Sequence, residues 1–295
     1  MTKNQKKRLI RSALIIIIAI IGIIYNRLEK SDVTVSDGSN ITNDYSYVHF
    51  IDVGQGDCTL IETHDGKFAL IDASTQSACD KIISYLENEG VNELEFVLFT
   101  HPHEDHIGCG DEVIENFLVK TIYMNDKVET TACYRKLIEA AGESKKTNGT
   151  KVIIPKENDV FKLSDIEFTV LSDGSLFDDL NSSSICLKME KGKSTFIFTG
   201  DAEKKVEKHI LENGESVAAE VYKSAHHGSS TSNSSSFLNA VNPDLAVTSC
   251  GEGNDYGHPH REVIEDFNER DILHKRTDLD GDIVLAFNEE NIMLL

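Results

Sequence analysis

Cysteine is scarce in this 295-residue sequence, and its six cysteines show neither a CxxC motif nor paired spacing. Domains that depend on disulfide scaffolds are usually short, secreted and rich in cysteine. The unpaired spacing and the length of the chain argue against such a scaffold, and we interpret most of the cysteines as small buried apolar residues. Hydrophobic residues make up 40% of the chain, which excludes wholesale disorder and fits one large domain or two ordinary ones.

Basic residues are also few outside the N-terminal region. The chain has 29 Lys and Arg against 50 Asp and Glu, a net charge of −21. Residues 1–30 hold seven of the basic residues and one acid, which leaves 22 basic and 49 acidic residues in the remainder. An acidic body repels phosphate backbones, so the composition argues against broad electrostatic capture of nucleic acid. A nucleic-acid substrate held at metal ions stays compatible with it.

A long hydrophobic run occurs only near the N-terminus, where a basic flank precedes it. We predict a basic cytoplasmic tail at 1–8 and a transmembrane signal anchor at 9–26. No A-x-A-like site follows, so cleavage as a signal peptide is the alternative. The rest of the chain is then expected to lie outside the cytoplasm on a single-pass membrane protein, or to be secreted if the segment is cleaved.

Residues 27–46 are polar and predict a flexible linker, after which short β-like runs alternate with helical patterns over 47–295. Expected strands include 47–53, 58–63, 67–73 and 95–100, and expected helices lie near 78–89, 131–142, 203–213, 234–241 and 260–270. Two strand-rich halves, each followed by helices, predict an α+β domain with two sheets packed face to face and helices outside.

The stretch FTHPHEDHIGCG places His101, His103, Asp105 and His106 directly after an apolar run that predicts a buried strand. Ligands commonly bind at the carboxyl ends of strands in open sheets. In a tight turn, His101 and His103 can face one point while Asp105 and His106 face a second point nearby. This spacing suits two divalent ions that share a bridging water.

Three further motifs place polar groups after apolar runs. FIFTGDAE puts Asp201 at a strand end, where it can bridge two cations, although such an Asp can also cap a helix. The sequence SAHHGSS contributes His226 and His227, and YGHPH contributes His258 and His260. We expect these groups to converge on one rim.

The motifs FIDVGQGDC, ALIDAS, THPHEDHIG, NSSSICLKM, FTGDAE, SAHHGSS and YGHPH occur in this order over about 47–295. In this arrangement the chain resembles the metallo-β-lactamase superfamily, and more closely the hydrolase domain of ComEC-type competence proteins. A related branch is the phosphorylcholine esterases of bacterial cell surfaces. The resemblance implies a four-layer αββα sandwich with a dinuclear metal site at its rim.

The resemblance also implies roles for individual residues. His101 and His103 would bind the first ion, Asp105, His106 and His258 the second, and Asp201 would bridge them. Many members have a third His for the first ion about 20 residues before the bridging Asp, but this chain has Asn181-Ser182-Ser183 there. The first site is thus expected to be poor in ligands, to use Asn181 or water, to favour a harder ion such as Mn²⁺ over Zn²⁺, or to be partly occupied.

The expected catalytic residues are His226, His227 and Asp105. One of the two histidines is expected to protonate the leaving group, while the other can instead be a ligand. By the same resemblance Asp72 would orient the metal-binding loop, and Asp52 and Asp57 could act similarly. Asp57 could equally be a turn residue, and His260 is interpreted as a loop-packing residue.

These features predict a metal-dependent hydrolase of phosphodiesterase or nuclease type that uses a metal-activated hydroxide. The expected substrate is a phosphodiester, either nucleic acid or a cell-envelope polymer. Alternatives are a phosphorylcholine esterase, a lactone, thioester or β-lactam hydrolase, and a non-catalytic, metal-containing accessory that binds DNA or an envelope polymer. The sequence has one hydrophobic segment instead of a many-helix channel, so DNA transport by this chain alone is not expected.

Overall fold

The computed structural model describes residues 33–36, 38, 41 and 43–295. The expected cytoplasmic tail and signal anchor, 1–8 and 9–26, lie outside the described residues. Within the described part of the chain, no helix combines the length and the apolar character that crossing a membrane requires.

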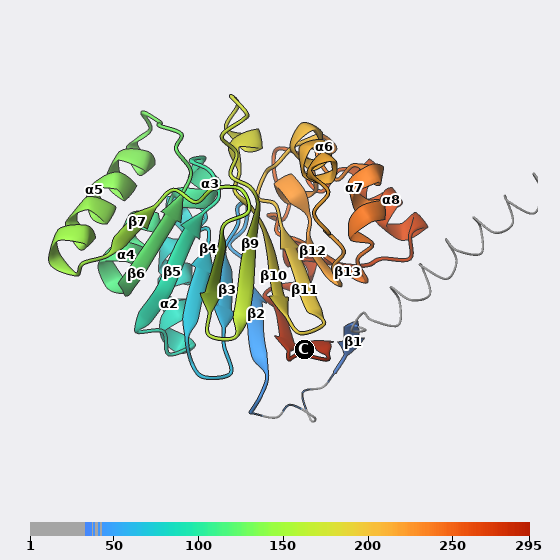
Figure 1. Cartoon of the computed structure of the whole chain (residues 1–295), viewed down its shortest axis with the longest axis horizontal. Coiled ribbons are helices and arrows are strands. Elements are labelled where there is room, and N and C mark those ends of the chain that lie inside the picture. Colours follow the sequence, from blue (N-terminus) through green and yellow to red (C-terminus); the bar gives the residue numbers. More distant parts are fainter. Residues whose placement is uncertain (1–32, 37, 39–40, 42) are drawn as a thin grey trace, which may run out of the picture.

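Two mixed sheets lie face to face, with helices on the outer side of each (Figure 1). The first has the order β1-β16-β15-β2-β3-β4-β5-β6-β7 and the second β14-β13-β12-β11-β10-β9-β8. The strands of the first sheet are β1 (Val33–Val35), β2 (Ser46–Phe50), β3 (Thr59–Glu62), β4 (Phe68–Ile71), β5 (Glu93–Phe99), β6 (Leu118–Met124), β7 (Lys151–Ile153), β15 (Ile283–Phe287) and β16 (Ile292–Leu294). Those of the second are β8 (Val160–Leu163), β9 (Ile166–Ser172), β10 (Cys186–Lys191), β11 (Ser194–Phe198), β12 (Val221–Lys223), β13 (Leu245–Thr248) and β14 (Leu273–Arg276).

The helices fall into two groups on the outer faces. Those near the first sheet are η1 (Gln76–Ala78), α2 (Cys79–Asn88), α3 (Glu104–Ile107), α4 (Gly110–Asn116) and α5 (Ala132–Thr147). The remaining ones are η2 (Asn181–Ser183), α6 (Lys204–Asn213), η3 (Ala225–Gly228), α7 (Ser235–Val241), α8 (Arg261–Glu269) and α9 (Thr277–Asp280). The prediction of two packed sheets with helices outside is confirmed.

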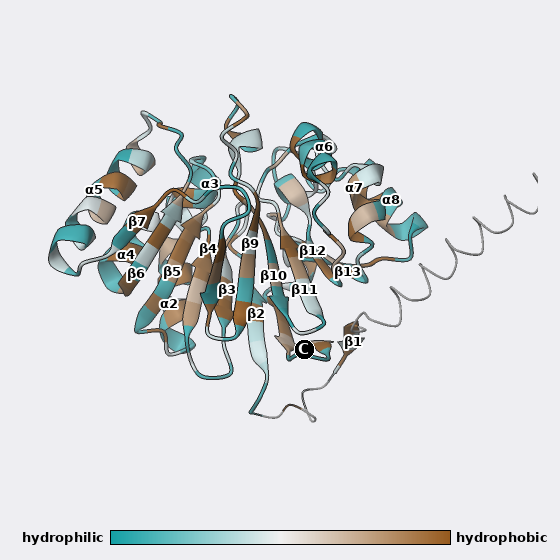
Figure 2. Ribbon diagram, in the orientation of Figure 1, coloured by the Kyte–Doolittle hydropathy of each residue, from teal (hydrophilic) through white to brown (hydrophobic). Residues whose placement is uncertain are grey.

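The core between the sheets follows from the alternation of side chains along the strands. On β2, Val48 and Phe50 point into the inter-sheet core with Phe198 and Leu285, whereas His49 points to the opposite face. Each fully buried large apolar side chain contributes about 2 kcal/mol by leaving water. Separate apolar clusters join α2, α4 and α5 to the first sheet, and α6, α7 and α8 to the second. Figure 2 shows hydrophobic strands between helices whose outer faces are polar.

The structure corrects the expected linker at one point. Residues 33–35, inside the segment 27–46, form β1 and pair in parallel with β16. Nothing in the local pattern of this polar segment indicates a partner more than 250 residues away, because pairing of an edge strand depends on the unpaired edge that the fold leaves open. The strand expected over 47–53 also ends earlier, at Phe50, and residues 51–57 form a loop toward the site.

Parallel pairing brings the candidate site residues to one rim. Strands β4, β5 and β6 are parallel neighbours in the first sheet, as are β11, β12 and β13 in the second. The segments that leave the carboxyl ends of β4, β5, β11, β12 and β13 contain the sequence motifs with His and Asp residues. The carboxyl ends of parallel strands form a common edge, so loops far apart in the sequence meet there.

Cys79 and Cys109 form a disulfide, so the interpretation as small buried residues applies to the other four cysteines and not to this pair. The disulfide joins the start of α2 to the residue just before α4, close behind the loop that holds the metal motif. The other cysteines, Cys58, Cys133, Cys186 and Cys250, are free and buried, as expected.

We expect the double substitution Cys79→Ala and Cys109→Ala to lower the free energy of unfolding. The disulfide closes a segment with a sequence separation of 30, and restricting a loop of that length in the unfolded chain stabilises the fold by about 3–4 kcal/mol. Urea unfolding with and without dithiothreitol would measure the effect. Reduction should destabilise the parent and leave the double variant unchanged, and equal sensitivity of both would contradict the prediction.

Candidate metal centre

His101, His103 and Asp201 form the first group of donor atoms, which all lie within 4.8 Å of one another. His101 follows β5, and its Nε2 lies 3.0 Å from His103 Nδ1 and 3.8 Å from Asp201 Oδ2. His101 and Asp201 are buried, whereas His103 is half-buried. Two imidazoles and one carboxylate oxygen thus face a common point.

Asp105, His106, Asp201 and His227 form the second group, with the same 4.8 Å limit. His106 Nε2 lies 3.1 Å from Asp201 Oδ1, and His227 Nε2 lies 3.2 Å from Asp105 Oδ2 and 3.7 Å from Asp201 Oδ1. Asp201 belongs to both groups and offers a different oxygen to each, which is the geometry of a bridging carboxylate.

The SAHHGSS turn uses an uncommon backbone to direct its histidines. His226 and His227 both have positive φ angles, +51° and +52°. This left-handed conformation is costly for residues with a side chain and occurs where a functional geometry requires it. It sends His227 into the buried group, while His226 stays nearer the rim with its Nε2 3.5 Å from Asp201 Oδ2.

A layer of hydrogen bonds behind the groups fixes the imidazoles. Asp72 Oδ2 lies 2.7 Å from His106 Nδ1 and also accepts a hydrogen bond from the Thr100 hydroxyl. The His227 Nδ1 faces the Ser249 carbonyl oxygen at 3.0 Å. These contacts leave the Nε2 atoms of His106 and His227 directed toward the carboxylates, as expected for ligands oriented by outer partners.

Sequence reasoning missed Ser184, whose hydroxyl lies 3.2 Å from His101 Nδ1 and accepts a hydrogen bond from the Asp201 backbone N–H. It lies in the NSSS motif, the stretch where the resemblance implies a third His ligand in many family members. Asn181, from the same motif, lines the cavity and has a buried side-chain oxygen without a hydrogen-bond partner. That oxygen is uncharged and could offer a lone pair to a cation held by the first group.

Lys223 and Asp57 form a second feature that the sequence did not reveal. The Nζ–Oδ1 distance is 2.8 Å, and the exposed fractions of the two side chains are 4% and 6%. Asp57 Oδ1 also lies 3.6 Å from His227 Nδ1, and the Asp57 N–H donates to the Asp105 carbonyl. The pair therefore supports the second group from behind. Asp52 instead lies near the surface, where it pairs with Lys81.

Electrostatics in the cluster follow from burial and close charges. Burial and the neighbouring His106 lower the pKa of His101 well below its ordinary value, which keeps this imidazole neutral. Burial alone would raise the pKa of Asp201, but the charges of His106 and His227 outweigh it and lower that pKa well below its usual range. Burial would lower the pKa of His106, yet Asp201 and Asp72 raise it well above its ordinary value.

His258 and His260 lie beside the two groups. The His258 ring centroid is 5.5 Å from that of His226 and 6.1 Å from that of His227, and its buried Nδ1 has no hydrogen-bond partner. The second group of donor atoms includes His227, which the sequence left open as a ligand, and does not include His258, the ligand implied by the family resemblance. His260 packs against His258 and its Nδ1 accepts a hydrogen bond from the Ser230 N–H.

A cavity of about 350 Å³ opens onto both groups. Its lining residues are Gln55, His103, Glu104, Asp105, Asn181, Asp201, His226, His227, Tyr256 and His258. A substrate entering this cavity meets the bridging carboxylate and His226, while His101 and His106 lie behind them.

Two buried atoms without hydrogen-bond partners also indicate a cation site, independently of the sequence motifs. The His106 Nε2 and Asp201 Oδ1 atoms are buried and face each other, but neither has a hydrogen-bond partner. Buried polar atoms without partners are costly, and in native proteins they usually have an unseen water or ion. Imidazole nitrogens with carboxylate oxygens are the donor set of Zn²⁺ and, with fewer nitrogens, of Mn²⁺.

Known proteins with the same pattern are found by sequence and by fold. The profile of the metallo-beta-lactamase superfamily matches residues 51–252. ComE operon protein 3 of Bacillus subtilis (strain 168) is 30% identical over 254 residues, which are 80% of this chain and 32% of that protein. The competence protein ComA of Neisseria gonorrhoeae is 30% identical over 232 residues, 78% of this chain and 30% of that protein. This chain therefore spans about a third of the length of these relatives.

A solved structure agrees with the fold. Igni18, a metallo hydrolase from the archaeon Ignicoccus hospitalis KIN4/I, superposes with a TM-score of 0.52 over 82% of this chain and 99% of its own, at 15% identity. The motif order, the two packed sheets and the profile match over most of the chain agree. The chain belongs to the metallo-β-lactamase superfamily and is a distant relative of the ComE operon protein 3 and ComA competence proteins.

Proposed function

We propose that this protein is a metal-dependent hydrolase that cleaves a phosphodiester outside the cytoplasmic membrane. The observation that carries the proposal is Asp201, which offers one oxygen to each of two groups of buried donors. His101, His103 and Asp201 would hold one divalent ion, and Asp105, His106, Asp201 and His227 the other, either Zn²⁺ or Mn²⁺. Asn181 or water would complete the first, ligand-poor site.

When bound, the ions would lower the pKa of a water so that hydroxide exists near neutral pH. The residues of this chain would orient the ligands and the substrate and would protonate the leaving group. Asp72 and the Ser249 carbonyl hold the imidazoles in place, and the cavity walls orient the substrate over Asp201. His226 is the candidate general acid, because its Nε2 faces the cavity while its Nδ1 contacts the Thr231 hydroxyl at 3.2 Å. It would donate its proton to the leaving oxygen.

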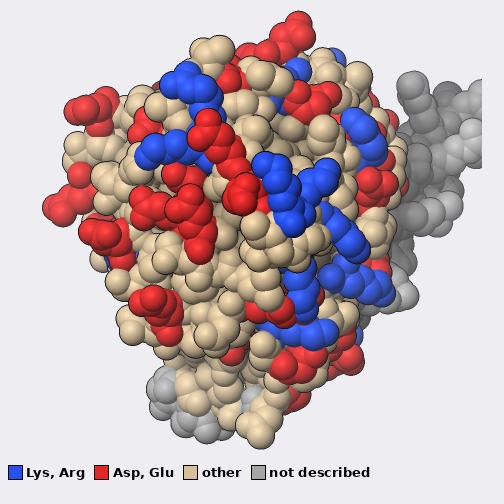
Figure 3. Space-filling model, turned by 90° about the vertical axis from the view of Figure 1, so that its left-hand side faces the viewer, with Lys and Arg blue, Asp and Glu red and all other residues tan. Residues whose placement is uncertain are grey.

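The preference for a phosphodiester rests on the relation to the competence proteins and on the extra histidine at the rim. The charge argues against broad electrostatic capture of nucleic acid, because the chain after residue 30 carries 49 acids and 22 bases. In Figure 3, Asp and Glu side chains gather on the left of the face with α5, and Lys and Arg side chains form a band through its centre and right with some acidic side chains among them. Lactone, thioester or β-lactam hydrolysis and phosphorylcholine-esterase activity are the enzymatic alternatives.

Turnover of bis-p-nitrophenyl phosphate with added Mn²⁺ or Zn²⁺ tests the proposal. We expect metal-dependent release of p-nitrophenol by the purified full chain and loss of this release with a chelator. Hydrolysis of lactones or β-lactams without phosphodiester turnover would replace the proposed substrate class. Absence of any metal-dependent turnover, together with binding of intact DNA or envelope polymer, would favour the non-catalytic accessory. A salt-sensitive gel shift would identify DNA as its ligand.

The roles proposed for His227 and His258 differ in a way that can be measured. We expect His227→Ala to remove about one bound ion per chain, because its Nε2 belongs to the second group. His258→Ala should retain the ions and lower turnover by about tenfold to a hundredfold through loss of substrate contacts. Metal analysis by mass spectrometry after dialysis provides the count. If His258→Ala loses an ion and His227→Ala does not, His258 is the ligand of the second ion, as the family resemblance implies.

The location outside the cytoplasm remains part of the proposal. The disulfide between Cys79 and Cys109 supports it, because disulfides persist in oxidising compartments and are rare in the cytosol. The segment 9–26 would anchor the chain in the membrane, or direct its secretion if it is removed. Alkylation of free thiols in intact cells, followed by mass spectrometry, would show whether these two cysteines are oxidised in place.

A further inference from the structure

A second set of metal-type donors lies on the outer face of the first sheet, beside α2. His49 comes from β2, Glu62 from the end of β3, and Glu89 from the residue that caps the C-terminus of α2. Their donor atoms all lie within 4.8 Å of one another. His49 points away from the inter-sheet core, so this set lies on a different face from the strand-end rim described above.

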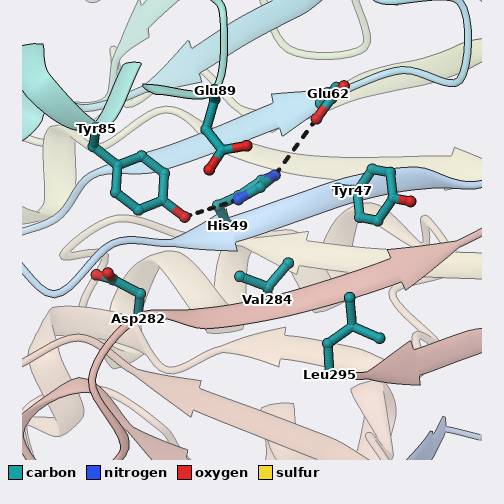
Figure 4. Close-up of a pocket in the computed structure, with 8 residues that line it drawn as sticks. All are labelled: Tyr47, His49, Glu62, Tyr85, Glu89, Asp282, Val284 and Leu295. Carbon is teal, nitrogen blue, oxygen red and sulfur yellow. Dashed lines mark hydrogen bonds and ion pairs between the residues drawn. The ribbon is translucent and has the colours of Figure 1, made fainter. Parts of the chain in front are cut away.

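His49 is the unusual member of the set. Its exposed fraction is 4%, and its Nε2 is buried without a hydrogen-bond partner. Glu62 Oε2 is 3.9 Å from this nitrogen, too far for a hydrogen bond. The Nδ1 atom is already engaged by the Tyr85 hydroxyl at 2.9 Å. Figure 4 shows the ring between Tyr85 at one end and Glu62 at the other, with the Glu89 carboxylate above the ring between these two.

The arrangement is that of an oriented ligand. The Tyr85 hydroxyl accepts from Nδ1–H in the tautomer whose Nε2 lone pair points toward Glu62, and this is the tautomer that a cation at Nε2 would select. In the other tautomer Nε2–H points toward Glu62 at 3.9 Å, beyond hydrogen-bond distance, so neither tautomer gives this buried nitrogen a protein partner. Buried polar atoms in native proteins seldom stay without a partner.

The charge around the set also favours a cation. A cavity of about 570 Å³ covers it, lined by Tyr47, His49, Glu62, Tyr85, Glu89, Asp282, Val284 and Leu295, with no Lys or Arg among these described lining residues. Glu89 adds its charge to the negative end of the α2 dipole. Burial and the nearby Glu89 raise the pKa of Glu62, which reflects the close approach of two carboxylates. Burial lowers the pKa of His49 to about 4, so this imidazole is neutral at pH 7.

We propose that His49, Glu62 and Glu89 bind a divalent cation of the Zn²⁺ or Mn²⁺ type, at a site separate from the strand-end cluster. One imidazole nitrogen and two carboxylates are a donor set that these ions accept. Three protein ligands leave at least one coordination position open toward the cavity for water. The ion would join β2 and β3 to the C-terminus of α2 and so fasten this helix to the sheet.

Equilibrium dialysis of the chelator-stripped full chain against Zn²⁺ tests the proposal through the number of ions bound. The test variant is Glu62→Gln with Glu89→Gln, which keeps side-chain size and removes the charges. The matched control is Glu87→Gln, an exposed acid on the same helix. We expect the double variant to bind one ion fewer per chain than the parent and Glu87→Gln to bind the same number. The same loss is expected in an Asp201→Asn background, so the result does not depend on the strand-end site.

A second measurement uses the absence of tryptophan, since the eight tyrosines then dominate the intrinsic fluorescence. Co²⁺ at the proposed site should quench Tyr85 and Tyr47, so the parent should lose more emission than the double variant. Far-ultraviolet circular dichroism of the metal-free proteins checks that each variant is folded. Equal Zn²⁺ stoichiometry and equal Co²⁺ quenching in the parent and a folded double variant would overturn the proposal. If the double variant does not fold, His49→Gln, which can still contact the Tyr85 hydroxyl, must lose the ion, and retention there would overturn it.

Discussion

Replacing Asp201 with asparagine is expected to reduce kcat/KM for a phosphodiester by about 1000-fold or more. Its two carboxylate oxygens face separate groups of donors, His101 at 3.8 Å and His106 at 3.1 Å. An amide offers one neutral oxygen in place of two charged ones, so one group loses its carboxylate and both lose its charge. Metal ions supply several kcal/mol of charge stabilisation in the transition state, and each 1.36 kcal/mol changes the rate about tenfold.

The measurement combines steady-state turnover of bis-p-nitrophenyl phosphate with metal analysis of the same samples. Glu212→Gln is the control, because Glu212 is an exposed acid on α6, outside the cluster. The fold should persist, since two apolar layers and the inter-sheet core are unchanged by the substitution. A folded Asp201→Asn protein with near-normal activity and its full complement of ions would remove the bridging role from Asp201.

Replacing Lys223 with methionine is expected to lower the free energy of unfolding by about 3–5 kcal/mol. The substitution leaves Asp57 as a buried carboxylate whose close cation is gone, in a place where only 6% of its side chain is exposed. Removing one partner of a buried ion pair costs far more than the pair contributes, because the remaining charge is desolvated. Urea unfolding of the metal-free protein measures the cost of the unpaired Asp57 carboxylate without any contribution from metal binding.

Two comparisons make the Lys223 result specific. The double variant Asp57→Asn with Lys223→Met should recover much of the loss, since no buried charge is left alone. The pair Arg261–Glu265 on α8 is exposed, at 85% and 54%, so Glu265→Gln should cost no more than about 1 kcal/mol. A Lys223→Met protein as stable as Glu265→Gln would show that water reaches Asp57.

The sequence predicted the parts of the candidate site that depend on short spacing. His101, His103, Asp105 and His106 lie within six residues, so one turn of chain brings them together whatever the rest of the fold does. Asp201 follows a strand that can be recognised from its apolar run, whereas the role of Asp72 came from the family resemblance. Strand ends in parallel sheets share an edge, and the convergence of these motifs follows from that rule.

Residues selected by long-range geometry were not predictable in the same way. Whether His227 or His258 reaches the second group depends on the left-handed backbone at 226–227, which several residue types adopt only under tertiary constraint. Lys223 and Ser184 lie in stretches whose local patterns predict only an ordinary strand and a polar turn. The partners of Cys79 and β1 lie 30 and more than 250 residues away, beyond any local pattern.

The amino-acid sequence alone determined the family, the two-sheet architecture and the concentration of imidazoles and carboxylates at strand ends, because periodicity and spacing are local properties of the chain. The tertiary structure alone decided which of those side chains face one another, which buried charge is paired with Lys223, and that His49 meets Glu62 and Glu89 on the opposite face of a strand. The physical reason is that such contacts depend on sheet order and register. These are set by the packing of the whole core, and a shift of one residue would turn every side chain to the other face.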